Sequence, residues 1–196
     1  MLNKKRVAVT GMGVISPIGI GKDSFFKSLK EGQSGVEIIS KFDTEGLSTK
    51  IAAEVKNFDP TAFIDKKEAK RMDRYAQFAV AASKIAIGDA SLDLDAIDKD
   101  RFGVCIGSGI GGLETLENQY KVMMEKGPGR VSPFFIPMMI SNIGAGHISM
   151  TFKAKGPNLT IVTACASATN AIGEAFKIIQ RNDADIMITG GAEASI

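Results

Sequence analysis

Short apolar runs alternate with longer amphipathic stretches along most of this chain. The apolar runs hold β-branched and aliphatic residues between glycines or polar residues, a pattern typical of buried strands. They lie at 6–10, 51–55, 101–107, 159–163 and 185–190. The stretches with helical spacing lie at 22–31, after Asp59-Pro60, at 72–88 and directly after 163. Strands that alternate with helices predict an α/β fold built on a largely parallel sheet flanked by helices.

The last strand-like run has little sequence after it. Asp185–Thr189 reads as a core strand, and only Gly190–Ile196 follows. A domain rarely stops just after a core strand, with no closing helix or polar tail. We therefore expect that 1–196 is the first part of a longer protein.

Composition and charge argue against several classes of protein. Hydrophobic residues make up 44% of the chain and the formal net charge is +2, so nothing overall favours nucleic acid or an anionic membrane. No stretch approaches the roughly 18 unbroken apolar residues of a membrane span. Two cysteines cannot form a disulfide framework, and the apolar run after Arg6 is broken by Gly11, Gly13 and Pro17 with no cleavage site after it. We expect a cytoplasmic protein.

One cysteine lies where a strand turns sharply into a helix. The strand-like run ends at Thr163 and the helical pattern begins at once, with Cys165 between them among small residues. The unpaired N–H groups and the dipole of a helix N-terminus favour a thiolate and can also stabilise an oxyanion. The alternative is a buried structural cysteine. A hydrolase-like Cys–His pair is hard to build, because the one histidine, His147, lies in a separate helix-like run.

Several motifs in the same order resemble one enzyme family. Thr163-Ala-Cys-Ala-Ser-Ala168 closely resembles the active-site motif of the elongating β-ketoacyl-[acyl carrier protein] synthases, synthase II above all. The other matching segments are Val7–Gly19, Lys70–Asp73, Gly107–Gly112, Ser132–Pro137 and Gly190–Glu193. The resemblance implies a thiolase-like α/β fold of two similar halves. Residues 1–196 would be the N-terminal half, with the C-terminal half absent.

The resemblance also implies a reaction. Cys165 would be the nucleophile that accepts an acyl group from acyl carrier protein, with its backbone N–H in the oxyanion hole. Malonyl carrier protein would then lose carbon dioxide and condense with that thioester to give a 3-oxoacyl product. This is an acyltransferase of fatty-acid biosynthesis that uses no metal or other cofactor. The family takes two histidines and a lysine for decarboxylation from its second half, so we expect that 1–196 alone cannot condense.

Two further positions match pocket residues of the family. Ile110 matches the base of the acyl-chain cavity. Phe135 matches an aromatic that lines the cavity of the partner subunit in a homodimer. For both residues, plain core packing is the alternative.

A basic surface is the expected contact for the acidic carrier protein. Four basic residues fall at i, i+3, i+4 and i+7, which is one face of a helix: Lys67, Lys70, Arg71 and Arg74. The opposite, core-facing stripe is Met72, Tyr75, Ala76, Ala79 and Val80. By resemblance this helix docks the carrier protein, and Arg130 matches a second docking site. A solvated face paired with nearby acids is the alternative.

Two other classes of function stay open. Gly107–Gly112 satisfies the G-x-G-x-x-G pattern between a strand and a helix, as a dinucleotide site does, but no ribose-binding acid follows at the end of a next strand. A tight glycine turn beside the acyl cavity is the better interpretation. The other class is a non-catalytic partner subunit that sets chain length beside an active synthase. Such partners usually lack the nucleophile, so Cys165 argues against it. His147 lies near small and apolar residues and Cys105 lies within an apolar strand, so we interpret both as packing residues without a catalytic role.

Overall fold

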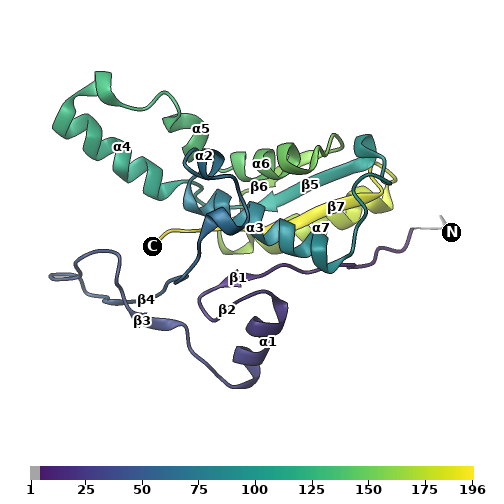
Figure 1. The fold of residues 1–196 in the computed structure, drawn as a ribbon, viewed down its shortest axis with the longest axis horizontal. Coiled ribbons are helices and arrows are strands. Elements are labelled where there is room, and N and C mark those ends of the chain that lie inside the picture. The colour runs from purple at the N-terminus through teal and green to yellow at the C-terminus, as the bar shows by residue number, and fades with distance from the viewer. Residues whose placement is uncertain (1–4) are drawn as a thin grey trace.

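The computed structural model describes residues 5–196, and a three-stranded parallel sheet is its centre (Figure 1). The strand order is β6-β5-β7, with β5 (Phe102–Gly107) between β6 (Asn158–Ile161) and β7 (Ile186–Gly191). Two small antiparallel pairs lie apart from this sheet. They are β1 (Ile15–Ser16) with β2 (Gly19–Ile20), and β3 (Val36–Ile38) with β4 (Ile51–Ala53). The three central strands lie close to their predicted bounds.

Helices cover both faces of the parallel sheet. α3 (Arg74–Asp89) and α6 (Ile143–Phe152) lie on one face, and α7 (Ser167–Gln180) lies on the other (Figure 1). The remaining helical elements are α1 (Lys22–Lys30), η1 (Pro60–Ala62), α2 (Lys66–Ala69), η2 (Lys99–Arg101), α4 (Leu113–Lys126), η3 (Pro128–Arg130), α5 (Phe135–Met139) and η4 (Ala164–Ala166), where η marks a 3₁₀ turn. The predicted α/β fold is thus confirmed.

The strand β5 is buried on both of its faces. Phe102, Val104 and Ile106 pack with α3 and α6, while Cys105 packs with Ala171 and Ala175 of α7. Successive side chains of a strand point to opposite faces, so a central strand with two covered faces must be apolar throughout. This is why 102–107 reads as an unbroken apolar run instead of an alternating one.

The predicted apolar stripe forms part of the core. Its five residues are buried: Met72 lies just before α3, and Tyr75, Ala76, Ala79 and Val80 lie in this helix. The Tyr75 hydroxyl donates a hydrogen bond to the carbonyl oxygen of Ile140 at 2.6 Å, and burial raises the pKa of this phenol. Tyr75 therefore joins α3 to the segment that leads into α6.

Residues 6–10 do not form a strand, although their apolar pattern predicts one. Within residues 5–196 this segment has no neighbouring strand, and the side chain of Val9 is 82% exposed. The next residues run closely past α3: a Cβ on Gly11 would lie 2.2 Å from the carbonyl oxygen of Ala86. An apolar pattern gives a strand only where the backbone N–H and C=O groups find partners. The prediction of a strand at 6–10 is therefore wrong.

The basic residues predicted to share one helix face are divided between two helices. α2 ends at Ala69, and the side chain of Asp73 then caps α3 by accepting a hydrogen bond from the N–H of Tyr75 at 3.2 Å. An aspartate at this position begins a new helix, so the spacing from Lys67 to Arg74 does not describe one face. Lys67 lies in α2, Lys70 and Arg71 lie between the helices, and Arg74 begins α3. The prediction of a single basic helix is wrong.

Candidate active site

Cys165 lies in the sharp turn between β6 and α7, as predicted. It is an exposed, free cysteine in η4, and α7 follows it directly. The turn requires unusual backbone geometry, because Ala164 has a φ of 50°. This left-handed conformation costs a non-glycine residue about 1–2 kcal/mol. Such strain persists only where the surrounding structure enforces it, and it is concentrated at functional sites.

The first turn of α7 enforces the conformation around Cys165. The buried hydroxyl of Ser167 accepts a hydrogen bond from the N–H of Thr163 at 2.9 Å and donates one to the carbonyl oxygen of Ala164 at 2.7 Å. The side-chain amide of Asn170 donates to the Thr163 hydroxyl oxygen at 2.7 Å. The thiol is thus held on a rigid backbone. The sequence identified Ser167 only as a small neighbour and missed this role.

The glycine-rich loop after β5 packs against the same turn. A Cβ on Gly107 would lie 2.3 Å from the carbonyl carbon of Ser167, a distance that no side chain can occupy. At the other end of the loop, Gly111 has a φ of 81°, and its Cβ would lie 2.6 Å from the carbonyl oxygen of Met139. Glycine is therefore required at both positions. The loop thus contacts the turn that carries Cys165 at one end and the end of α5 at the other.

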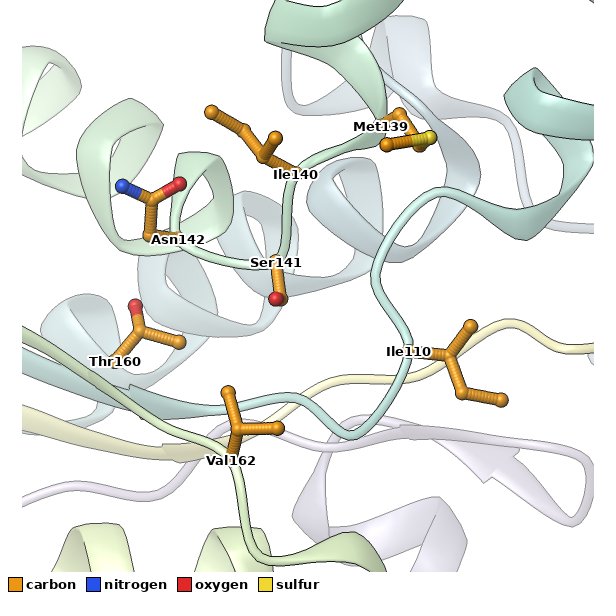
Figure 2. Close-up of a pocket in the computed structure, with 7 residues that line it drawn as sticks. All are labelled: Ile110, Met139, Ile140, Ser141, Asn142, Thr160 and Val162. Atoms are coloured by element: carbon orange, nitrogen blue, oxygen red, sulfur yellow. The ribbon is translucent and has the colours of Figure 1, made fainter.

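A cavity of about 330 Å³ opens between this loop, β6 and the segment after α5. Figure 2 shows its lining: Ile110, Met139, Ile140, Ser141, Asn142, Thr160 and Val162. Ile110 projects from the glycine-rich loop, and Val162 lies on the segment that leads from β6 to Cys165 (Figure 2). The cavity thus lies beside the turn that carries Cys165, and its wall has both apolar and polar side chains. Phe135 is partly buried in α5 and is not one of the residues that line it.

A carboxylate that the sequence did not single out binds the glycine-rich loop. Glu193 follows β7, and its carboxylate oxygens accept hydrogen bonds from the N–H groups of Gly109, Ile110 and Gly111 at 2.6, 3.1 and 3.3 Å. The Ser108 hydroxyl lies 3.3 Å from the same carboxylate. A dinucleotide site offers such N–H groups to a phosphate. Here they already bind a side chain of the protein, which argues against the dinucleotide interpretation.

The predicted carrier-protein contacts have different surroundings. Lys67, Lys70, Arg71 and Arg130 are exposed, and the Arg71 guanidinium lies over the Phe134 ring at 4.9 Å from its centroid. Arg74 is half-buried: its guanidinium lies 4.9 Å from the Phe78 ring centroid and donates a hydrogen bond to the carbonyl oxygen of Val55 at 3.0 Å. The structure therefore leaves four of the five basic side chains available and uses Arg74 in packing.

Two further titratable residues lie in packed surroundings, as predicted. Cys105 is fully buried in β5, and burial raises the pKa of its thiol to about 11. His147 is half-buried in α6, where desolvation lowers its pKa and the nearby Glu68 carboxylate opposes that shift.

Within residues 5–196, no three His, Cys, Asp or Glu side chains gather as a metal site. Among the helices of that range, none is long and apolar enough to cross a membrane.

Comparisons with known proteins agree with this fold and identify the family. The family described as "Beta-ketoacyl synthase, N-terminal domain" matches residues 4–196. The 3-oxoacyl-[acyl-carrier-protein] synthase 2 of Staphylococcus aureus (strain COL) is 53% identical over 196 residues, which is 100% of this chain and 47% of that protein. The enzyme of the same name from Synechocystis sp. is 50% identical over 195 residues, again covering 100% of this chain and 47% of that protein.

A solved structure shares the fold. The ishigamide ketosynthase/chain length factor has a TM-score of 0.89 and 31% sequence identity, over 97% of this chain and 48% of that one. Fold and site thus define an α/β protein of the thiolase-like ketosynthase class. The chain belongs to the β-ketoacyl synthase family and matches its N-terminal domain. It spans about half the length of the curated relatives it matches.

Proposed function

We propose that this chain is the N-terminal half of a 3-oxoacyl-[acyl-carrier-protein] synthase, an acyltransferase of fatty-acid elongation. The observation that carries the proposal is the exposed Cys165 on a rigid strand-to-helix turn, beside a cavity lined by Ile110. The relatives named 3-oxoacyl-[acyl-carrier-protein] synthase 2 support the substrate class. We further infer that the protein acts in the cytoplasm, which its two free cysteines support.

Two steps follow from this assignment. The Cys165 thiolate attacks the thioester carbonyl of a carrier protein that is loaded with an acyl group. The carbon–sulfur bond to the carrier then breaks, and the released carrier thiolate takes a proton. The backbone N–H of Cys165 stabilises the oxyanion formed on the way. Malonyl carrier protein then loses carbon dioxide, and its carbanion attacks the Cys165 thioester and releases the thiol. The acyl chain occupies the cavity at Ile110 while it is bound to Cys165.

The carrier protein would approach the basic side chains that remain exposed. Lys67, Lys70, Arg71 and Arg130 offer positive charge to an acidic partner, whereas Arg74 contributes through packing. Charged contacts at the rim of an interface act mainly on the association rate and its salt dependence. The assignment of Phe135 to the cavity of a partner subunit, and the homodimer it requires, belong to the same proposal.

Mass spectrometry tests the nucleophile directly. The protein to use carries these 196 residues within a chain of the relatives' full length, referred to below as the complete synthase. Incubation with carrier protein that is loaded with an acyl group should add one acyl group to the complete synthase. The Cys165→Ser variant should gain none, and the Cys105→Ala variant should gain one as a matched control.

Either of two results would contradict the assignment. Acylation that survives Cys165→Ser would place the nucleophile elsewhere. A complete synthase that accepts no acyl group, but pairs with an active synthase and changes its product length, would favour the chain-length partner instead.

A further inference from the structure

We propose that Glu193 is a positioning residue of the acyl pocket: its carboxylate holds the backbone of residues 109–111 and so determines where the Ile110 side chain stands in the cavity wall. The proposal rests on the function proposed above and deepens it. It concerns a residue 83 positions from Ile110 in sequence, whose contact with the loop only the fold creates.

The argument begins with the two peptide groups on either side of Ile110. The N–H of Ile110 belongs to one of these groups and the N–H of Gly111 to the other, and both donate to the Glu193 carboxylate, at 3.1 and 3.3 Å. A peptide group is planar, so an N–H that is hydrogen-bonded restrains the rotation of the whole group. With the groups on both sides of Ile110 restrained, the direction of its Cα–Cβ bond is restrained as well.

The loop has few other restraints between its two ends. Its ends are held by hydrogen bonds from the Ser108 N–H to the Ile161 carbonyl at 3.2 Å and from the Gly112 N–H to the Met139 carbonyl at 2.8 Å. All three N–H groups between those ends donate to Glu193. Glycines flank Ile110 on both sides and have wide backbone freedom. Without the carboxylate, this part of the loop could therefore adopt several conformations.

The backbone just before Glu193 is itself held against β5 and the first turn of α7, next to Cys165. The N–H of the preceding residue, Ala192, donates to the carbonyl oxygen of Gly107 at 3.0 Å. A Cβ on Gly191 would lie 2.6 Å from the Cβ of Ala168, which is in the first turn of α7. Glu193 thus connects the wall of the cavity with the helix that begins just after Cys165. The distance between Ile110 and the thiol follows from this connection.

Glu193 also suits a test by substitution, because it is exposed and lies outside the apolar core. Its removal opens no cavity in the core, so the protein should still fold. In Glu193→Gln one oxygen remains to accept from Gly109 and Ile110, while the new amide group cannot accept from Gly111. Glu193→Ala loses every acceptor. The proposal therefore predicts a graded effect, with the glutamine variant between wild type and the alanine variant.

The first measurement is hydrogen exchange in the complete synthase. Glu193→Ala should speed amide exchange at residues 109–111 and leave β5 and α7 unchanged, while the exposed Glu117→Ala variant should change nothing. Unchanged exchange at 109–111 would overturn the proposal. This readout needs no substrate, so it tests the role of Glu193 even if the proposed function fails.

The second measurement is the rate of Cys165 acylation with acyl carrier proteins of increasing chain length. Glu193→Ala should lower kcat/KM for long acyl chains on the order of tenfold, comparable with the loss of hydrogen bonds to a charged group. The rate with the shortest chain, and alkylation of Cys165 by iodoacetamide, should stay near wild type. An equal loss at all lengths together with slower alkylation would overturn the pocket role. A wild-type protein that takes no acyl group would instead contradict the proposed function.

Discussion

The side chain of Asp73 accepts two hydrogen bonds from Thr115, which lies 42 positions further along the chain. The buried carboxylate accepts hydrogen bonds from the Thr115 N–H at 2.9 Å and from its hydroxyl at 2.6 Å. Asp73 also caps α3, and Thr115 lies in the first turn of α4, so one side chain accepts a hydrogen bond from a free N–H group of each of two helices. Asp73 thereby fixes the start of α4 relative to α3 (Figure 1). The segment after α4 holds Arg130 and Phe135.

We predict that Thr115→Val destabilises the protein by about 1.5–3 kcal/mol, because a buried carboxylate loses one donor while its charge remains. Chemical denaturation followed by circular dichroism measures the change. Thr49→Val is the matched control, since Thr49 is exposed, and it should have little effect. Equal stability of Thr115→Val and wild type would show that the hydroxyl contact contributes nothing.

Gly111 should not tolerate a side chain. With a φ of 81° and a backbone oxygen 2.6 Å from the position of a Cβ, Gly111→Ala should lose more than about 1 kcal/mol of stability. Gly129→Ala is the comparison, because no atom lies within 4 Å of its Cβ position. Thermal unfolding of both variants checks this, and similar melting temperatures would contradict it.

The two thiols should differ strongly in reactivity. At a pH of about 8, iodoacetamide should modify the exposed Cys165 and leave Cys105 intact, because Cys105 is fully buried and its pKa of about 11 keeps it protonated. Peptide mass spectrometry identifies the modified residue. In urea both cysteines should react. Modification of Cys105 in the folded protein would show that β5 opens to solvent.

Charge reversal should weaken carrier-protein binding if the basic surface is the docking site. Lys70→Glu combined with Arg71→Glu should raise the Kd for acyl carrier protein about tenfold at low salt and flatten its salt dependence. The control reverses Lys27 and Lys30 on α1, which lies on another side of the molecule (Figure 1). An unchanged salt slope in the first variant would remove the docking proposal.

The single histidine should make stability depend on pH. Burial lowers the pKa of His147, so the folded state binds fewer protons than the unfolded state once the pH falls below about 6.5. Stability from this group is therefore complete above that pH and is lost as the pH falls through the lowered pKa. Comparison of His147→Gln with wild type between about pH 7 and about pH 5 isolates the effect. The variant should show the shallower loss, and parallel curves would contradict it.

Local patterns in the sequence predict the parts of this fold that local physics determines. The unbroken apolar run at 102–107 predicts a central strand, and the spacing of Tyr75, Ala76 and Ala79 predicts the buried face of α3. The segment 6–10 has an equally apolar pattern, but a strand also needs a neighbouring backbone, and no local pattern shows whether one is present. The cap at Asp73 could have been recognised, since an aspartate before a helical run is an N-terminal signal.

The candidate site divides in the same way. The position of Cys165 follows from a strand that ends next to a helix that begins, which is visible in sequence. The hydrogen bonds that the glycine-rich loop donates to Glu193 join residues more than 80 positions apart, so no spacing rule could reveal them. In the sequence, Glu193 stands out only as the end of the Gly190–Glu193 motif. The setting of Cys165 is therefore a local property of the sequence, whereas the shape of the neighbouring cavity is not.

The contact between Gly107 and Ser167 has a consequence for variation at this site. Because a side chain at 107 would collide with the backbone that presents Cys165, substitutions there would disable the nucleophile before they could reshape the pocket. Ile110 is different: it is more than half exposed and is one of the residues that line the cavity. A library that seeks new acyl-chain preferences should therefore randomise position 110 and leave Gly107 and Gly111 unchanged, because a Cβ at either glycine would collide with backbone atoms. Neighbouring positions of one short loop thus differ in how much variation they tolerate.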